Sequence, residues 1–140
     1  MKHQIFNNTA LLRLEPGEEV LAGLKALCRQ ESVTLGTVQG IGAVNRAVLG
    51  LFDPATKQYR ANVFEENLEI VSLTGNITTM DGEVYLHLHM AVSDEQGRVF
   101  GGHLTEAVIS VTAEIVVTRI DGMVGRKFSE AIGINLLEVY

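Results

Sequence analysis

Apolar residues between positions 16 and 30 recur with the period of a helix. They fall along one stripe of an α-helix, because residues three, four and seven apart share a face. The stripe consists of Val20, Leu21, Leu24, Leu27 and Cys28. Pro16 suits the first turn of such a helix, since its missing N–H needs no partner there. The pattern predicts one amphipathic helix over about residues 16–30, with Cys28 on its buried side.

Most of the remaining chain has the apolar runs and alternation of β-strands. Extended segments are predicted over residues 10–14, 33–39, 43–52, 59–64, 108–120 and 134–139, with a bend or bulge at 40–42. Residues 128–131 are interpreted as a short turn or helical piece, and His3 as a solvated side chain in a mobile tail. The expected fold class is α+β: a single domain over residues 1–140, with a mostly antiparallel β-sheet, one main helix and a short C-terminal helical piece.

The pair Asp81-Gly82, between two strand-like runs, predicts a hairpin with a two-residue type I′ turn. Such a turn pairs Met80 with Glu83 and thereby sets the register of both strands. One face of the hairpin then becomes apolar and the other polar. The apolar pairs are Ile77 with Leu86, Leu73 with Met90 and Val71 with Val92; the polar pairs are Thr74 with His89, Asn76 with His87 and Thr78 with Tyr85.

A second hairpin is predicted around residues 94–98. A three-residue loop with Gly97 in the left-handed conformation pairs Asp94 with Arg98. This register places His103 opposite His89, Thr105 opposite His87 and Leu104 opposite Leu88. A four-residue loop would turn His103 to the other face, and a bulge at residues 101–102 could also alter the register.

Composition limits the classes of function. The chain has 140 residues, 46% of them hydrophobic, with one cysteine and a formal net charge of -6. No apolar run approaches the ~20 residues that cross a bilayer, no signal peptide is evident, and the lone Cys28 suits a reducing, cytoplasmic setting. Nucleic-acid binding is disfavoured, because it normally needs clustered Lys and Arg. A basic patch built by oligomerisation remains open.

The predicted registers gather His87, His89 and His103 on one polar face. Three imidazoles with a free fourth position are typical of catalytic zinc, whereas structural zinc sites are closed by four protein ligands. Thr74, Asn76 and Thr105 surround the cluster and could hydrogen-bond its members. Imidazole also binds nickel, copper and iron. A divalent transition metal is therefore expected, and zinc is chosen among these metals because of its availability. The alternative is a polar sheet face whose histidines pack together without a metal.

Three segments of the chain resemble the plants-and-prokaryotes-conserved (PPC) domain family. These are EIVSLTGNI (69–77), YLHLHMAVSDEQGRVFGGHL (85–104) and AEIVV (113–117), within a resemblance that runs from about Arg13 to residue 140. The resemblance implies a compact domain with a largely antiparallel sheet that assembles as a homotrimer. Plant members carry the domain after AT-hook segments of nuclear proteins, and prokaryotic members are often named for DNA binding. This chain has no AT-hook, but it keeps the three histidines, which the plant forms lack.

Three functions follow as hypotheses. The first is a cytoplasmic, metal-binding homotrimer with a small polar or anionic ligand in the open position. The second is an oligomerisation or protein-interaction module without catalysis, and the third is direct DNA binding. Glu106 and Glu114 are candidate general bases, especially from a partner subunit, but the sequence assigns no reaction and no catalytic residue.

Overall fold

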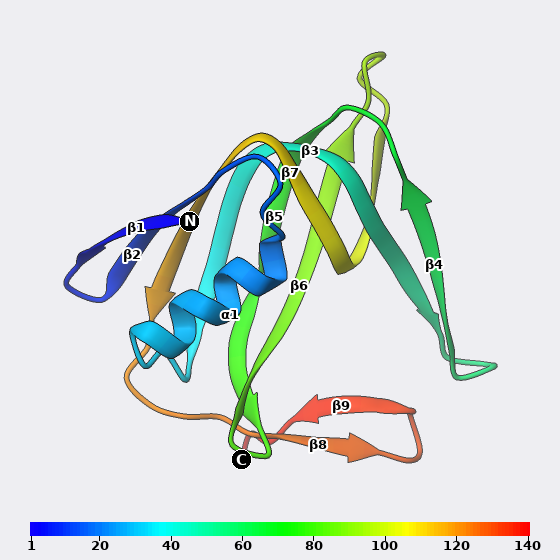
Figure 1. Ribbon diagram of the computed structural model, residues 1–140. Coiled ribbons are helices and arrows are strands. Elements are labelled where there is room, and N and C mark those ends of the chain that lie inside the picture. Colours follow the sequence, from blue (N-terminus) through cyan, green and yellow to red (C-terminus); the bar gives the residue numbers. More distant parts are fainter.

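Long β-strands dominate the computed structural model, which describes residues 1–140 (Figure 1). In chain order the elements are β1 Lys2–Phe6, β2 Thr9–Leu14, α1 Val20–Gln30, β3 Gly36–Asp53, β4 Gln58–Phe64, β5 Leu68–Met80, β6 Glu83–Ser93, β7 Val99–Arg119, β8 Arg126–Ser129 and β9 Ile134–Leu137. All their pairings are antiparallel. The α+β fold class, with a mostly antiparallel sheet and one main helix, is confirmed.

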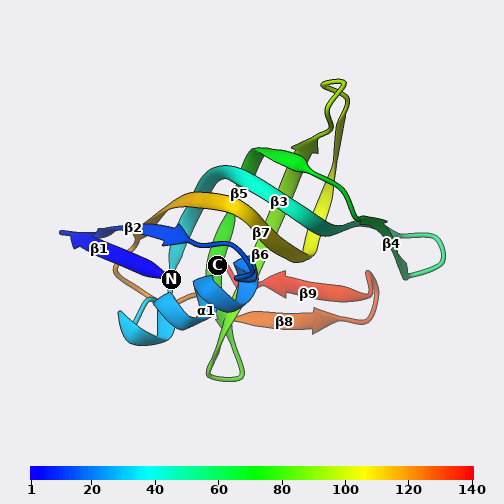
Figure 2. The same ribbon diagram turned by 45° about the horizontal axis from the view of Figure 1, so that its top comes forward.

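The main sheet closes on itself. Its seven strands follow the order β1-β2-β7-β6-β5-β3-β4, and β3 also pairs with β7. The ladders β7–β6, β6–β5, β5–β3 and β3–β7 therefore form a ring. Each of these four strands is hydrogen-bonded to a neighbour on both of its edges. The β1–β2 hairpin and β4 extend from opposite sides of this ring (Figure 2).

Helix α1 lies across the sheet and covers part of the core (Figure 1). Its residues Val20, Leu24, Leu27 and Cys28 are buried, as the apolar stripe predicts. The helix begins at Val20 and not at Pro16. Gly17 has a left-handed φ of 86°, which interrupts the helical conformation, and the Glu19 carboxylate instead caps the amides of Leu21 and Ala22.

The first predicted hairpin is confirmed over most of its length. Asp81 and Gly82 both have positive φ, as a type I′ turn requires, and the ladder pairs Leu73 with Met90 and Ile77 with Leu86. The expected pairing of Val71 with Val92 is wrong, because a bulge lies between Ile70 and Ser72 and Val92 pairs with Ile70.

The second hairpin has the predicted three-residue loop. Gly97 has a φ of 75°, and the Asp94 carboxylate pairs with the Arg98 guanidinium at 2.6 Å. The amides of Gln96 and Arg98 also donate to Asp94 Oδ1, at 3.0 and 2.9 Å. This buried carboxylate organises the loop and sets the register of β6 against β7.

Both ends of the chain differ from the sequence prediction. The expected C-terminal helical piece at 128–131 is wrong: β8 continues to Ser129, a turn follows, and β9 pairs back onto β8. The expected mobile tail is wrong too, because His3 lies in β1 and its Nε2 is 2.9 Å from the Glu31 carboxylate. The pattern of apolar and polar residues predicts neither β1 nor the β8–β9 hairpin, because short exposed strands depend on pairing with a neighbouring strand.

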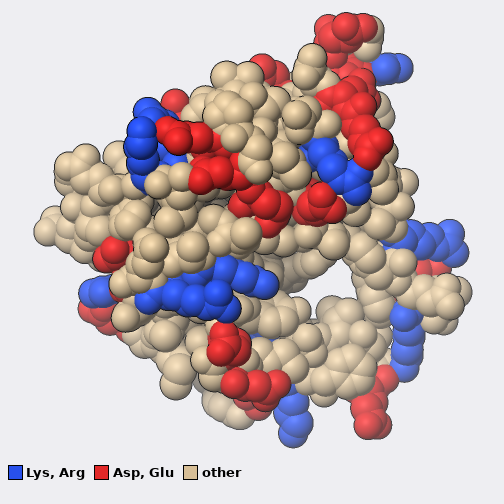
Figure 3. Space-filling model, in the orientation of Figure 1, with Lys and Arg blue, Asp and Glu red and all other residues tan.

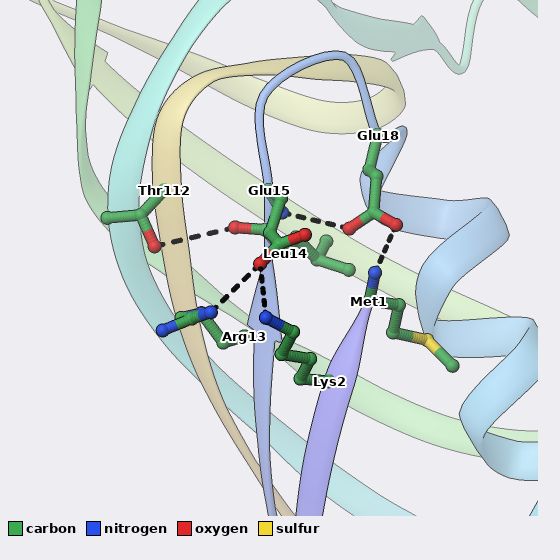
Figure 4. Close-up of polar contacts among 7 residues, drawn as sticks. All are labelled: Met1, Lys2, Arg13, Leu14, Glu15, Glu18 and Thr112. Carbon is green, nitrogen blue, oxygen red and sulfur yellow. Dashed lines mark hydrogen bonds and ion pairs between the residues drawn. The ribbon is translucent and has the colours of Figure 1, made fainter.

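Charged contacts hold β1 against the loop that precedes α1 (Figure 4). Glu18 accepts from the Met1 amino group and from the Glu15 amide. The Glu15 carboxylate pairs with Lys2 at 3.2 Å and with Arg13 at 2.8 Å. These charged contacts add to the β1–β2 ladder and to the packing of Met1 against the core.

Candidate metal centre

Three histidines converge on the outer face of the β6–β7 pair. One ligand nitrogen from each of His87, His89 and His103 lies within 4.8 Å of the other two. Ring centroids are separated by 5.2 to 5.7 Å. His87 and His103 are half-buried, while His89 is exposed. The cluster is therefore reachable from solvent on one side.

Strand geometry explains the convergence. His87 and His89 are two residues apart on β6 and so face the same way, and His103 on β7 is the direct ladder partner of His89. That pair ends the β6–β7 ladder. The expected pairings of His87 with Thr105 and of Leu88 with Leu104 are wrong, because β7 leaves β6 here and Leu104 pairs with Leu49 of β3.

Tyr59 of β4 supports His103 from the side. Its ring meets the imidazole edge-on at 5.7 Å, and its hydroxyl donates to the His103 backbone carbonyl at 3.0 Å. A second hydrogen bond, 2.9 Å long, joins the same hydroxyl to Thr105 Oγ1. The ring lies directly over Gly50, where a Cβ atom would come within 2.3 Å of Tyr59 Cζ and Oη. Sequence reasoning missed Tyr59, since nothing local places β4 beside β7.

Arg126 of β8 approaches the other end of the cluster. Its guanidinium donates to Thr78 Oγ1 and to Asn76 Oδ1, each at 2.8 Å, and its Cζ lies 4.6 Å from the centre of the Tyr85 ring. Asn76 is the ladder partner of His87. Arg126 was also missed, because the sequence offers no signal that β8 returns to β5.

Electrostatics keep at least two of the imidazoles ready to act as neutral ligands. Burial lowers the pKa of His87 below its ordinary 6.5, and the nearby His103, Arg126 and His89 lower it further. Burial, followed by the charge of His89, also lowers the pKa of His103. Both rings are consequently neutral at pH 7, the form in which imidazole binds a metal.

The remaining predicted site residues take separate positions. Thr74 is the ladder partner of His89 and remains a predicted neighbour of the cluster. Thr105 bonds to Tyr59. The Glu106 carboxylate accepts a hydrogen bond from Arg46 Nε at 2.8 Å. In the sheet, Glu114 is the ladder partner of Arg13 on β2 and of Ile41 on β3. Neither glutamate is joined to a histidine by an ion pair.

The donor set fits a divalent transition metal. Three imidazole nitrogens suit zinc, which holds such ligands at about 2.0–2.1 Å. Two nitrogens at that distance from one ion are at most ~4.2 Å apart. Small rotations of the rings would close the triad from its 4.8 Å spread. Such rotations are accessible to half-exposed side chains.

The fold is that of a known family. A model of the Plants and Prokaryotes Conserved (PCC, also written PPC) domain matches residues 1–121. The chain belongs to this family.

Individual relatives are similar over different spans. The bifunctional protein GlmU of Synechococcus sp. (strain JA-3-3Ab) is 41% identical over 108 residues, which cover 76% of this chain and 16% of that protein. The chain thus spans a small part of the curated relatives that it matches.

Solved structures match nearly the whole chain. A candidate DNA-binding protein from Bacteroides thetaiotaomicron is 31% identical, with a TM-score of 0.95 over 98% of this chain and 96% of that one. A metal-containing protein from Archaeoglobus fulgidus is 30% identical, with a TM-score of 0.87 over 96% and 95% of the two chains.

The surface and the helix content add two further facts. Lys and Arg side chains lie in separate groups among Asp and Glu, with no continuous basic area on the face shown in Figure 3. The single helix α1 is too short to cross a membrane.

Proposed function

We propose that this protein binds a divalent transition metal, zinc by availability, through His87, His89 and His103. The observation that carries the proposal is the convergence of three imidazole nitrogens within 4.8 Å on a solvent-accessible face. The lowered pKa values of His87 and His103 support it, because protons compete weakly for these rings. The metal-containing relative from Archaeoglobus fulgidus agrees with it.

When bound, such an ion supplies Lewis-acid chemistry and one open position for a small polar or anionic ligand. The protein's own groups orient the site. Tyr59 holds the β7 backbone at His103, and Asn76 and Thr74 flank the β6 histidines across the ladder. No general base is assigned.

Metal analysis of purified variants tests the proposal. We expect one zinc per chain in the wild type, and at least about tenfold weaker binding in His103→Ala, since even outer partners of metal ligands contribute that much. His3→Ala is the matched control, because this fourth histidine pairs with Glu31 away from the cluster. Equal zinc binding by wild type and His103→Ala would contradict the assignment.

Assembly as a cytoplasmic homotrimer is part of the same proposal. Exposed apolar side chains from several strands, among them Leu11, Ile41, Val71 and Val116, line one hollow of about 870 Å³. Apolar patches of this kind commonly mark contacts between subunits. Light scattering on the eluting protein should give three times the chain mass of 15.2 kDa, and a mass of one chain would contradict it.

A second candidate function is that of an interaction module without catalysis. The relatives named GlmU favour it, since a segment like this chain makes up 16% of each of them. Retention of partner binding by a triple His→Ala variant would support the module over the metal site. Direct DNA binding is opposed by the net charge of -6; a salt-dependent gel shift near physiological ionic strength would restore it.

A further inference from the structure

Arg126 is a buried cation with neutral partners. Only 8% of the residue is exposed. Its three intramolecular hydrogen bonds go to Thr78 Oγ1 at 2.8 Å, Asn76 Oδ1 at 2.8 Å and the Asn135 backbone carbonyl at 3.1 Å. The ion pairs of the chain do not include Arg126. A buried charge is costly unless an opposite charge accompanies it.

The position of Arg126 relates it to the histidine cluster. One terminal nitrogen contacts Asn76, the residue directly across the ladder from His87. Its Cζ lies 4.6 Å from the centre of the Tyr85 ring, and Tyr85 is two residues before His87 on the same side of β6. The guanidinium therefore lies next to the cluster.

The guanidinium keeps capacity for a ligand. Arginine has five N–H donors, and three of them serve Thr78, Asn135 and Asn76. One N–H remains on each terminal nitrogen. The face drawn in Figure 3 has an opening between the β3–β4 hairpin and the β8–β9 hairpin, the elements that carry Tyr59 and Arg126. The exposed side chain of His89 leaves the cluster open to a small molecule from solvent.

Charge balance then indicates what the site receives. Three imidazole ligands, a divalent ion and one guanidinium would make a strongly positive centre, and no carboxylate pairs with any of these side chains. We infer that Arg126 selects a small carboxylate as the ligand of the open position, by pairing its planar fork with the carboxylate oxygens. This inference rests on the proposed metal site. The planar, two-oxygen group matches the fork better than a single-atom anion does.

Binding to the cobalt-loaded protein tests the inference, because the visible spectrum of cobalt reports occupancy of the open position. Acetate is the anionic probe and imidazole the neutral one. We expect Arg126→Met to weaken acetate binding about tenfold or more, the effect of losing a charge-assisted pair. Imidazole binding should change by less than about twofold. Arg126→Lys, which keeps the charge without the fork, should fall between wild type and Arg126→Met.

A second variant covers the case in which Arg126→Met fails to fold. Arg126→Lys keeps a cation at this position but lacks the planar fork, so acetate binding should weaken while cobalt remains bound. Unchanged acetate affinity in the folded variants would overturn the inference, as would equal losses for acetate and imidazole. Failure of the wild type to take up cobalt would instead refute the metal site itself, so the two failures are distinguishable.

Discussion

Substitution of Gly50 by alanine tests whether β4 supports the metal centre. Gly50 lies on β3 opposite His103 of β7 and opposite Ala61 of β4. A Cβ atom at this position would lie 2.3 Å from Tyr59 Cζ and Oη and 2.5 Å from the Arg60 carbonyl oxygen. Contacts this short cannot persist. The Tyr59 ring must move away, and the nearby backbone of β4 has little freedom to follow.

The expected magnitude combines two effects. Overpacking of this kind costs about 1–3 kcal/mol. Departure of the ring also breaks the two hydrogen bonds of the Tyr59 hydroxyl, each worth about 0.5 kcal/mol at an exposed site. Gly50→Ala should therefore lower the free energy of unfolding by about 2–4 kcal/mol. Zinc binding should weaken as well, because the backbone at His103 loses its lateral support.

Urea denaturation and zinc titration of three proteins measure these effects. Tyr59→Phe is the matched control, since it keeps the ring and removes only the hydroxyl, so its loss of stability should be about 1 kcal/mol. Refutation would come from Gly50→Ala matching the wild type in both stability and zinc affinity. That result would mean that the ring over Gly50 contributes nothing to the position of His103.

Three further predictions concern titration, reactivity and loop order. The pKa values of His87 and His103 are lowered in the folded state, so the unfolded chain takes up protons at a higher pH than the folded protein does. The metal-free protein should therefore lose stability as the pH falls below 6.5. Urea unfolding in a chelator between pH 8 and 5 should show this decline, and a flat profile would contradict it. Burial raises the pKa of Cys28 to about 11, so a thiol reagent should label it only after urea is added, and rapid labelling of the native protein would be contrary to expectation. Asp94→Ala should cost about 1–3 kcal/mol, because the amides of Gln96 and Arg98 lose their charged acceptor. Faster hydrogen exchange of the Arg98 amide should accompany the loss, and unchanged exchange would count against it.

The two hairpins show how far local chemistry predicts this fold. Asp81-Gly82 and Gly97 occupy the positive-φ positions that their turns require, and a turn type sets the pairing of the strands that it joins. His89 consequently faces His103 in the structure as predicted. The prediction fails at Val71, where a bulge shifts the register, because nothing in the turn determines where a strand bends farther along.

The candidate site likewise contains some residues that the sequence could identify and others that it could not. Its three histidines could be found from the sequence, since their relative positions depend only on strand period and hairpin register. Tyr59 and Arg126 could not. They reach the cluster through the closure of β3 on β7 and through the return of the β8–β9 hairpin to β5. Both contacts join residues far apart in the chain.

By itself, the sequence determined the amphipathic helix, the two turns and the face on which the histidines gather. These features depend on interactions between residues close in the chain, whose geometry the backbone periods specify. Only the tertiary structure decided what surrounds the histidines: a tyrosine held over a glycine on one side and a buried guanidinium on the other. Such neighbours are set by packing between distant strands, and no local pattern of residues encodes which strands meet.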